Sequence, residues 1–380
     1  MTNSAIAIRV TGRTWTRRRL NALRVATQVA GLGLGPVMLY LTVLWVAQSR
    51  GVIAVDFRHA YLPAAHDVLH GRSPYPSLDD PTVAAGAAYV YPAPLALASM
   101  PFLAVSPGIA AWAVTLLLLS LVPVTLLVLQ VRDWRCYGAA LLWGSVGSAI
   151  QTANVSIPFA LVLALAWRYR HRYAGIATGL ATALKIFTWP LLVWLLATRR
   201  YRQALAAGVA ALAIVVAAWA VVGFDTFPHY VSLVHRVNDL EASDAYSVYG
   251  LLTELGAPAV IGKAVWLLVG LAALAGCVLF GRLDNDRTSF AFAVAAALVL
   301  SPIVWLHYFT LLLVPLAVVR PRFGLAWLLP VLLWTAPADA NHRSPWQTGL
   351  TLAVVMALVA AATLPKTSSR RRPLGVLRRA

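Results

Sequence analysis

Residues 109–131 read IAAWAVTLLLLSLVPVTLLVLQV and contain no charged side chain. A helix of about 20 apolar residues is the length that the ~30 Å hydrocarbon core of a membrane requires. Two further stretches, 204–222 and 259–281, have the same character, apart from Lys263 near one end. The sequence therefore predicts a fold that is decided by membrane-spanning helices.

The composition of the whole chain agrees with this prediction. Of the 380 residues, 60% are hydrophobic and 12% are charged, and the mean hydropathy is +0.75. These values exclude a water-soluble globular protein. Because apolar stretches recur along the chain, a signal peptide does not explain them. The two cysteines, Cys136 and Cys277, predict neither a disulfide framework nor a metal site.

Positive charge gathers in seven arginine-rich clusters. The chain has 31 Lys plus Arg against 13 Asp plus Glu, a net charge of +18. Cytoplasmic loops are enriched in Lys and Arg, so clusters in the cytoplasm account for this excess without a nucleic-acid partner. Anionic lipid headgroups are then the expected neighbours of the cytoplasmic face. The clusters are 9–24, 132–135, 168–172, 199–202, 282–287, 320–322 and 366–379.

This constraint predicts an all-α polytopic membrane protein of about 12 transmembrane helices, with both termini in the cytoplasm. Several predicted segments are too short for a full crossing, which indicates half-helices or hairpins beside a protein-lined cavity. The apolar stretch 89–105 contains three prolines, and we interpret it as juxtamembrane or re-entrant, with a thirteenth span as the alternative. The predicted spans are 27–46, 109–131, 137–150, 155–167, 174–187, 188–198, 204–222, 259–281, 289–305, 307–319, 323–336 and 346–364.

The predicted topology divides the chain into three parts. Residues 1–26 form a basic cytoplasmic segment, 27–364 form the polytopic domain, and 365–380 form a basic cytoplasmic tail. Two long outer loops are expected within the domain, at about 48–108 and 223–258. Polar residues of the second loop could bind a sugar acceptor, but their spacing does not say which of them does.

The first outer loop reads VDFRHAYLPAAHDVLHGRSPYP over 55–76. Its apolar residues follow a helical period, which predicts a helix lying in the outer interface, and Gly71 is placed to end it. His66 and His70 could share a metal, but no third ligand lies nearby in the sequence, so a solvated helix face is expected. The apolar stripe consists of Phe57, Tyr61, Ala64 and Val68.

Three polar residues in this apolar chain are candidates for chemistry. Asp56 could cap the following helix or act as a general base at the membrane surface, where partial desolvation raises a carboxyl pKa. Lys185 interrupts an apolar hairpin and should either extend toward water or meet an anion such as a phosphate. His307 is either an interfacial residue in an aromatic belt or a phosphate partner on the same face as Asp56 and Lys185.

The order and spacing of these motifs resemble glycosyltransferase family 87, within the GT-C superfamily of polytopic glycosyltransferases. The resemblance covers most of the chain. One departure is Ile150, because the family pattern usually has Gly before the residue that matches Gln151. The motifs are Asp56 with the aromatic and small residues after it, 71–75, Tyr91 and Pro92 with Pro94, 151–156, Gly175 and Gly179 leading to Lys185 and Pro190, and Ser301 and Pro302 with Trp305 and His307.

The resemblance implies an inverting transferase on the outer face of a bacterial cytoplasmic membrane. It would move a sugar, with mannose favoured, from a polyprenyl-phosphate donor to a glycolipid or cell-envelope glycan acceptor. Asp56 is the expected catalytic base, and Lys185, His307 and Arg58 are the expected ligands of the donor phosphate. No metal ligand and no cofactor beyond the lipid-linked mannose or arabinose donor is predicted, and metal dependence stays open. Further candidates for donor or acceptor binding are His59, Tyr61, Tyr75, Gln151, Asn154 and Trp305.

Three alternatives remain. An arabinofuranosyltransferase of the same family is the nearest, and a secondary transporter shares the layout of twelve spans with both ends inside. Transporters usually have paired halves and polar residues near the membrane midplane, whereas the polar candidates here concentrate on one face, which favours an enzyme. A scaffold or flippase-like subunit is the third alternative, in which Asp56→Asn would cause no loss of function.

Overall fold

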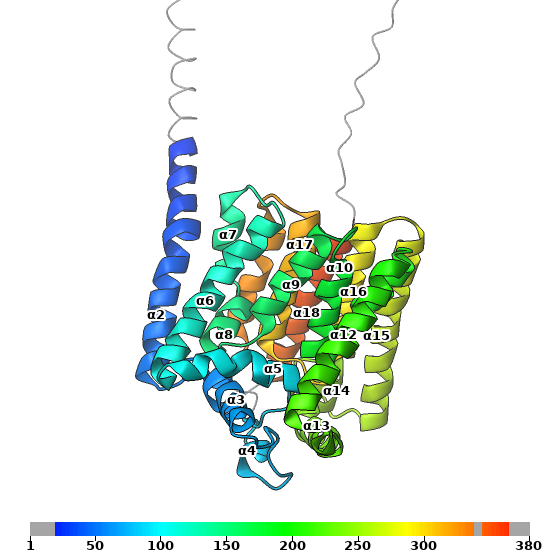
Figure 1. Cartoon of the computed structure of the whole chain (residues 1–380). Coiled ribbons are helices and arrows are strands. Elements are labelled where there is room, and N and C mark those ends of the chain that lie inside the picture. The colour runs from blue at the N-terminus through cyan, green and yellow to red at the C-terminus, as the bar shows by residue number, and fades with distance from the viewer. Residues whose placement is uncertain (1–19, 338–343, 365–380) are drawn as a thin grey trace, which may run out of the picture.

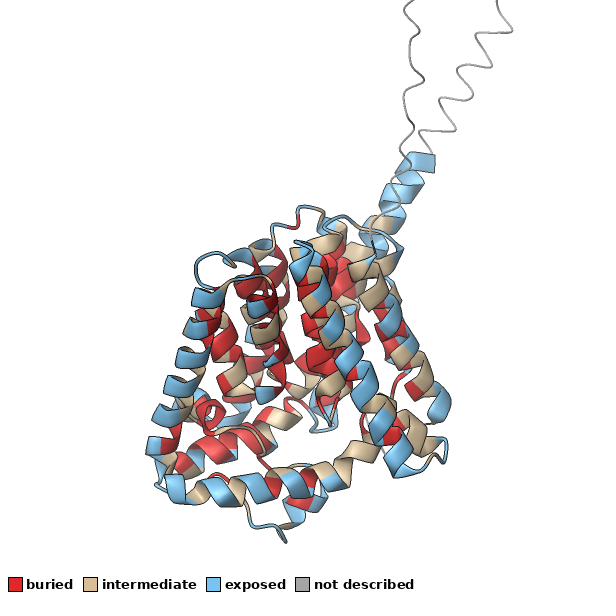
Figure 2. Ribbon diagram, turned by 90° about the vertical axis from the view of Figure 1, so that its right-hand side faces the viewer, coloured by how far each residue is buried: buried red, intermediate tan, exposed pale blue. Residues whose placement is uncertain are grey.

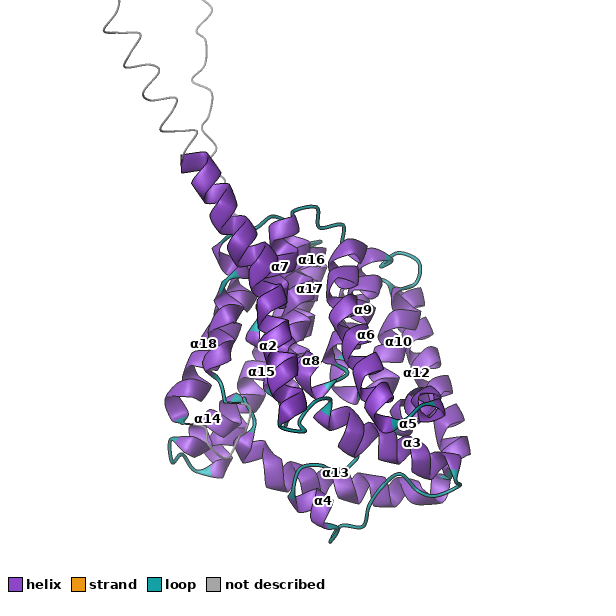
Figure 3. Ribbon diagram, turned by 90° about the vertical axis from the view of Figure 1, so that its left-hand side faces the viewer, coloured by secondary structure: helices purple, strands orange, loops and turns teal. Residues whose placement is uncertain are grey.

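The computed structural model describes residues 20–337 and 344–364, and all regular elements within these ranges are helices (Figure 3). Five of these helices are long and apolar enough to cross a membrane, and they stand together as a bundle (Figure 1). The predicted tail 365–380 and residues 1–19 of the predicted basic segment lie outside the described residues. The five helices are Leu20–Ser49, which contains η1 (Val29–Leu34) and α2 (Gly35–Ser49), α6 (Pro107–Val128), α12 (Tyr201–Val222), α15 (Ala259–Arg282) and α18 (Pro345–Thr363).

Shorter helices fill the space between the long ones, as the short predicted segments led us to expect. The prediction of one helix over 137–150 is wrong, because two separate helices cover that stretch. Likewise, 307–319 begins as a 3₁₀ helix and 323–336 contains two 3₁₀ pieces. The twelve predicted crossings are therefore not twelve full-length helices. The shorter elements are α7 (Trp134–Leu141), α8 (Gly144–Thr152), α9 (Ser156–Arg168), α10 (Ala174–Leu184), η4 (Ile186–Thr188), α11 (Pro190–Ala197), α16 (Asp286–Leu300), η7 (Leu306–Leu312), α17 (Leu313–Val319), η8 (Leu325–Trp327) and η9 (Leu329–Thr335).

The outer faces of the long helices are apolar and exposed, whereas buried residues lie between the helices (Figure 2). On α12 the exposed large residues recur at steps of four, three and four, which is one face of a helix. Such a continuous apolar face is what lipid tails would cover. These residues are Leu205, Val209, Leu212 and Val216.

One end of the bundle collects the five arginine-rich clusters between residues 132 and 322, and we call it the basic end. Asp286 accepts hydrogen bonds from Arg170 and Arg200, with closest distances of 3.0 and 2.7 Å. Asp133 pairs with Arg135 at 2.9 Å and accepts a hydrogen bond from the backbone N–H of Phe323. The Asp286 contacts join the clusters 168–172, 199–202 and 282–287, and the Asp133 contact joins 132–135 to the residue that follows 320–322. For these clusters the structure agrees with the shared face that the sequence predicts.

Two glycines on α10 allow this helix to pack closely on α12. A Cβ on Gly175 would lie 2.4 Å from the carbonyl oxygen of Gln203, and a Cβ on Gly179 would lie 2.6 Å from that of Ala207. Pairs of small residues four positions apart permit such backbone approach between apolar helices. This packing fixes the position of Lys185, which follows α10 directly.

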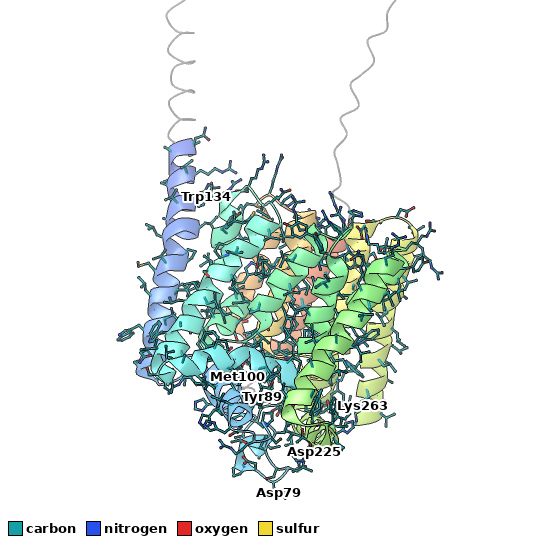
Figure 4. The ribbon with its side chains drawn as sticks, in the orientation of Figure 1. Asp79, Tyr89, Met100, Trp134, Asp225 and Lys263 are labelled. Carbon is teal, nitrogen blue, oxygen red and sulfur yellow. The ribbon has the colours of Figure 1, made fainter. Side chains whose placement is uncertain are left out.

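The opposite end, which we call the loop end, holds the two segments predicted as outer loops. Figure 4 shows Asp79 and Asp225 at this end and Trp134 at the basic end. The segments meet where His229 Nε2 contacts the carbonyl oxygen of Pro76 at 2.8 Å. The first contains η2 (Phe57–Tyr61), α3 (Leu62–Leu69), α4 (Pro81–Ala84), α5 (Ala93–Ser99) and η3 (Met100–Ala104), and the second contains η5 (Phe224–Thr226), α13 (Phe227–Glu241), η6 (Ala242–Asp244) and α14 (Val248–Glu254).

Within the first of these segments, the apolar helical stripe faces protein. All four of its residues are buried, so the prediction of a helix that lays this stripe in the membrane interface is wrong. Gly71 follows the helix with a φ of 69°, as expected for its end. Residues 89–105 form the short helices α5 and η3, and neither is long enough for a span.

Candidate active site

Asp56 lies half-buried between the first long helix and η2. Although it occupies the position before η2, its side chain makes no capping hydrogen bond, so the capping role is wrong. Its Oδ2 instead accepts a hydrogen bond of 2.5 Å from the side-chain amide of Asn154. Burial raises the pKa of the Asp56 carboxyl, and the Asn154 hydrogen bond and the charge of Lys185 oppose this rise. The group therefore has the elevated pKa that suits a general base.

Two hydrogen bonds from Gln151 hold the chain that leads to Asp56. The Gln151 side-chain amide donates to the carbonyl oxygen of Val52 at 2.7 Å, and its backbone carbonyl accepts from the N–H of Ala54 at 2.7 Å. Ala54 has a φ of 53°, a conformation that costs a residue with a Cβ about 1–2 kcal/mol. Gln151, which we expected at the sugar, thus uses its amide to fix the backbone beside Asp56.

Asn154 sits where the axis turns by 118° between α8 and α9. Its Oδ1 accepts hydrogen bonds from the N–H and the hydroxyl of Ser156, at 3.0 and 2.7 Å. The Nδ2 group consequently faces Asp56, and it lies 3.3 Å from Tyr61 Oη and 3.5 Å from Tyr91 Oη. Because Asn154 is fully buried, the interrupted helix is a rigid support for the carboxylate.

Lys185 ends α10 and directs its ammonium into a group of aromatic rings. The Nζ atom lies 4.6 Å from the ring centre of Tyr91, 3.9 Å from that of Tyr308 and 5.6 Å from that of Phe187. It also donates a hydrogen bond to the Tyr308 hydroxyl. Aromatic faces attract a cation but do not neutralise it, so the ammonium is still able to bind an anion. Tyr91 and Tyr308 were absent from the predicted site residues.

His307 is buried at the start of η7, next to Tyr308, with a distance of 4.9 Å between ring centres. Its side chain is therefore enclosed by protein, and its position in an interfacial aromatic belt, one of the two expectations, stays a prediction. In the described part of the chain, its Nε2 is buried and has no hydrogen-bond partner. A buried ring nitrogen without a partner is costly, and a ligand that offers a hydrogen bond would remove this cost.

Two other candidates lie at the surface of the first segment. The Arg58 guanidinium donates to the carbonyl oxygen of Gly51 at 3.4 Å, and His59 is exposed. The imidazoles of His66 and His70 have ring centres 4.2 Å apart. Across residues 20–337 and 344–364, no group of three His, Cys, Asp or Glu side chains is placed to hold a metal ion.

Tyr75 and Trp305 hydrogen-bond to the backbone of Tyr91 and Tyr308, the two tyrosines beside Lys185. Tyr75 is buried, donates a hydrogen bond of 3.2 Å to the carbonyl oxygen of Tyr91 and stacks on Trp219 with ring centres 5.6 Å apart. The backbone carbonyl of Trp305 accepts a hydrogen bond of 3.0 Å from the N–H of Tyr308. Both residues therefore position the rings around Lys185.

The site contains a carboxylate, Asp56, and an ammonium, Lys185, that are not paired with one another. The charge of Lys185 lowers the pKa of Asp56, but within the described ranges the two groups form no ion pair. A carboxylate can take a proton from a hydroxyl while an ammonium stabilises an anion that leaves. Such a site suits the transfer of a group from an anionic leaving group to a hydroxyl.

Comparisons with known proteins agree with this chemistry. The model of glycosyltransferase family 87 matches residues 89–306, which is more than half of the chain and includes Asn154 and Lys185 but neither Asp56 nor His307. No solved structure matches.

Two curated relatives come from mycobacteria. One, from Mycobacterium tuberculosis, is a polyprenol-phosphate-mannose-dependent alpha-(1-2)-phosphatidylinositol pentamannoside mannosyltransferase, 26% identical over 219 residues that cover 54% of this chain and 47% of the relative. The other, from Mycolicibacterium smegmatis, is a polyprenol-phosphate-mannose-dependent alpha-(1-2)-phosphatidylinositol mannoside mannosyltransferase, 27% identical over 193 residues, or 47% of this chain and 40% of the relative. The matched part of the chain thus spans less than half the length of either relative.

Proposed function

The chain belongs to glycosyltransferase family 87, and from this membership we propose that it transfers a mannosyl group from a polyprenyl-phosphate donor to a glycolipid acceptor. The activities named for both relatives support the donor and the class of acceptor. The structural observation that carries the proposal is the site itself, where Asn154, which holds Asp56, and Lys185 both lie beside Tyr91, and where Asp56 and Lys185 form no ion pair among the described residues. An arabinofuranosyl donor is the alternative within the family.

The orientation that we propose puts the basic end in the cytoplasm and the site at the outer face of the cytoplasmic membrane. Enrichment of arginine at one end supports this orientation, and anionic lipid headgroups would neighbour that end. We further propose that the shorter helices complete crossings in pairs, and that the bent pair of α8 and α9 is one of them. Because the outer face lacks nucleotide-linked sugars, a lipid phosphate would serve as both carrier and leaving group.

In the proposed reaction, Asp56 accepts the proton of an acceptor hydroxyl as that oxygen attacks the anomeric carbon of the donor. The bond between this carbon and the phosphate oxygen breaks, and its electron pair leaves with the lipid phosphate. Attack from the face opposite the phosphate inverts the anomeric centre. Asn154 holds one carboxylate oxygen of Asp56, which leaves the other free for the hydroxyl.

Negative charge grows on the leaving phosphate in this transition state. We propose that the Lys185 ammonium and an N–H at His307 Nε2 stabilise this charge, since both side chains lie against Tyr308 and that nitrogen has no hydrogen-bond partner among the described residues. Preorganised groups of this kind stabilise developing charge strongly, because they need no reorganisation during the reaction. Arg58 remains a candidate ligand of the donor phosphate, and His59 remains a candidate for acceptor or donor binding, both from the surface of the first segment.

The proposal is tested with the full chain in lipid nanodiscs, radiolabelled polyprenyl-phosphate mannose and phosphatidylinositol mannosides. Wild type and Asp67→Asn should transfer mannose, whereas Asp56→Asn should not. Asp67 is a matched control, since it lies in the same segment but outside the site, where its carboxylate forms an ion pair with Arg72 at a distance of 2.6 Å. Equal transfer by Asp56→Asn and wild type would contradict the role of Asp56. Absence of transfer from mannosyl and arabinosyl donors, together with ligand flux in sealed vesicles, would favour a transporter.

A further inference from the structure

Helix α13 brings one face of the second loop-end segment against the first. It runs across the loop end beside α4 (Figure 3). Leu233 and Val237 are buried on this face, and Tyr230 packs on Tyr75 with ring centres 4.9 Å apart. Glu241 follows Val237 by four residues, so it lies on the same face of the helix. The last residue of α13 thus points toward the first segment.

A glycine opposite Glu241 lets this carboxylate come close. A Cβ on Gly86 would lie 3.0 Å from Glu241 Oε1, and the backbone φ of Gly86 is 67°. Both the space and the φ favour glycine at this position. The carboxylate therefore lies against the chain that continues to Tyr89 and Tyr91.

The charge of Glu241 acts on the candidate active site. Burial raises the pKa of Glu241 to about 7, with contributions from the charges of Asp244 and Asp56. Its own charge contributes to raising the pKa of Tyr91, the residue whose ring lies below Lys185. Among the residues that the structure describes, no cation is within ion-pair distance of Glu241. A second carboxylate without a salt-bridge partner among the described residues thus lies near enough to the site for its charge to act there.

Asn238 adds another acceptor one turn before Glu241. In the described ranges, its Oδ1 is buried and lacks a hydrogen-bond partner. Residues three apart on a helix are neighbours on its surface. A ligand that carries several hydroxyl groups would satisfy both side chains at once.

We propose that Glu241, assisted by Asn238, binds the acceptor sugar through a hydroxyl next to the one that Asp56 deprotonates. This inference rests on the proposed glycosyl transfer, and it names the residues that select the acceptor. Sugars carry hydroxyl groups on neighbouring carbons, so two carboxylates on different elements can each bind one of these hydroxyls. Asp56 takes the proton of one hydroxyl, while Glu241 only accepts a hydrogen bond from the next.

The test compares Glu241→Gln with Asp239→Asn in the full chain in nanodiscs. Asp239 is an exposed acidic residue of the same helix, so it controls for the loss of one charge. The acceptors are a phosphatidylinositol mannoside and its analogue that lacks the hydroxyl next to the reactive one. Glu241→Gln should raise the KM for the intact acceptor about tenfold and leave the KM for polyprenyl-phosphate mannose unchanged. It should also lose most of the discrimination between the two acceptors.

A second variant, Gly86→Ala, tests the same contact without altering Glu241, because the added Cβ would displace the carboxylate. Acceptor binding is measured separately through tryptophan fluorescence without donor. The inference would be overturned if Glu241→Gln bound the acceptor with unchanged affinity and had an unchanged KM for the acceptor. It would also be overturned if the variant changed only the KM for the donor. If the wild-type protein binds the acceptor but transfers no sugar, the proposed function is contradicted. The comparison of acceptor binding between wild type and Glu241→Gln would still decide the role of Glu241.

Discussion

The side-chain amide of Asn154 donates a hydrogen bond of 2.5 Å to the carboxylate of Asp56, across 98 positions of sequence. The bond joins the bend between α8 and α9 to the segment before η2. It holds one carboxylate oxygen, and the two hydrogen bonds from Gln151 hold the backbone that carries it. A half-buried carboxylate at the loop end is thereby fixed to the helix bundle.

Replacing Asn154 by alanine should lower kcat at least tenfold, because the Asp56 carboxylate loses its fixed direction. The Asn154 hydrogen bond lowers the pKa of Asp56, so the variant should have a higher pKa at this group. Since the base acts only when ionised, the acidic limb of the plot of kcat/KM against pH should move to higher pH. Asn285→Ala, which removes a cap from α16 at the basic end, should leave that limb in place. A limb that does not move in Asn154→Ala would contradict this link.

Lys185→Met should reduce kcat about 100-fold, the typical loss when one group that stabilises transition-state charge is removed. Methionine keeps the length and apolar contacts of the side chain within the aromatic rings. Lys263→Met is the control, since Lys263 is exposed and lies 5.9 Å from the ring centre of Tyr249. Steady-state transfer rates give kcat for Lys185→Met and for Lys263→Met. Similar values for both variants would exclude Lys185 as a phosphate ligand.

Gly179→Ala should destabilise the protein by about 1–3 kcal/mol, because its Cβ would collide with the backbone of α12. Gly208 lies on α12 with no atom within 4 Å of an added Cβ. Gly208→Ala should therefore be neutral or stabilising by up to about 1 kcal/mol. Thermal unfolding in detergent measures both, and equal melting temperatures would show that α10 and α12 do not need this close approach.

Asp286→Asn should destabilise the basic end by about 1–2 kcal/mol, because Arg170 and Arg200 lose a shared, largely buried partner. Burial alone would raise the pKa of Asp286, but hydrogen bonds from Arg200 and Trp194 make the net change a lowering. The stabilisation is then present above the ordinary Asp pKa of about 4 and is lost as the pH falls through the lower folded-state value. Unfolding at several pH values should show this acid-dependent loss in wild type and in the exposed control Asp284→Asn, but less of it in Asp286→Asn.

The sequence predicted the long helices well. The expected spans 109–131, 204–222 and 259–281 correspond to α6, α12 and α15 within a few residues, because long uncharged runs permit few other structures in lipid. Arginine clusters also predicted which ends of the helices lie together. In contrast, apolar runs of 10–15 residues do not reveal where a helix tightens into a 3₁₀ turn or breaks, as at Asn154.

Asp56, Asn154 and Lys185 were all named as candidates from their residue types and motifs. Glu241 was included only among the polar residues of the second outer loop, Tyr91 only as a motif of the resemblance, and Tyr308 was not a predicted site residue, although each contributes to the surroundings of these groups. Their signal was weak, because tyrosine is common at membrane edges and one glutamate among several acidic residues has no distinguishing spacing. Gln151 was named for a sugar contact, and the structure gives its amide a backbone partner.

The sequence by itself determined that the chain is apolar enough for a membrane and which ends of its helices are basic. It also showed which polar residues interrupt apolar stretches and are therefore candidates for a function. These properties follow from local composition, since the transfer of charge into lipid is costly wherever it occurs. Only the tertiary structure decided that Asp56 meets Asn154, that Lys185 lies among aromatic rings, and that Glu241 lies against Gly86. Contacts between distant segments depend on how helices pack, and packing is set by close approaches such as that of Gly179 to α12, which no single stretch of sequence contains.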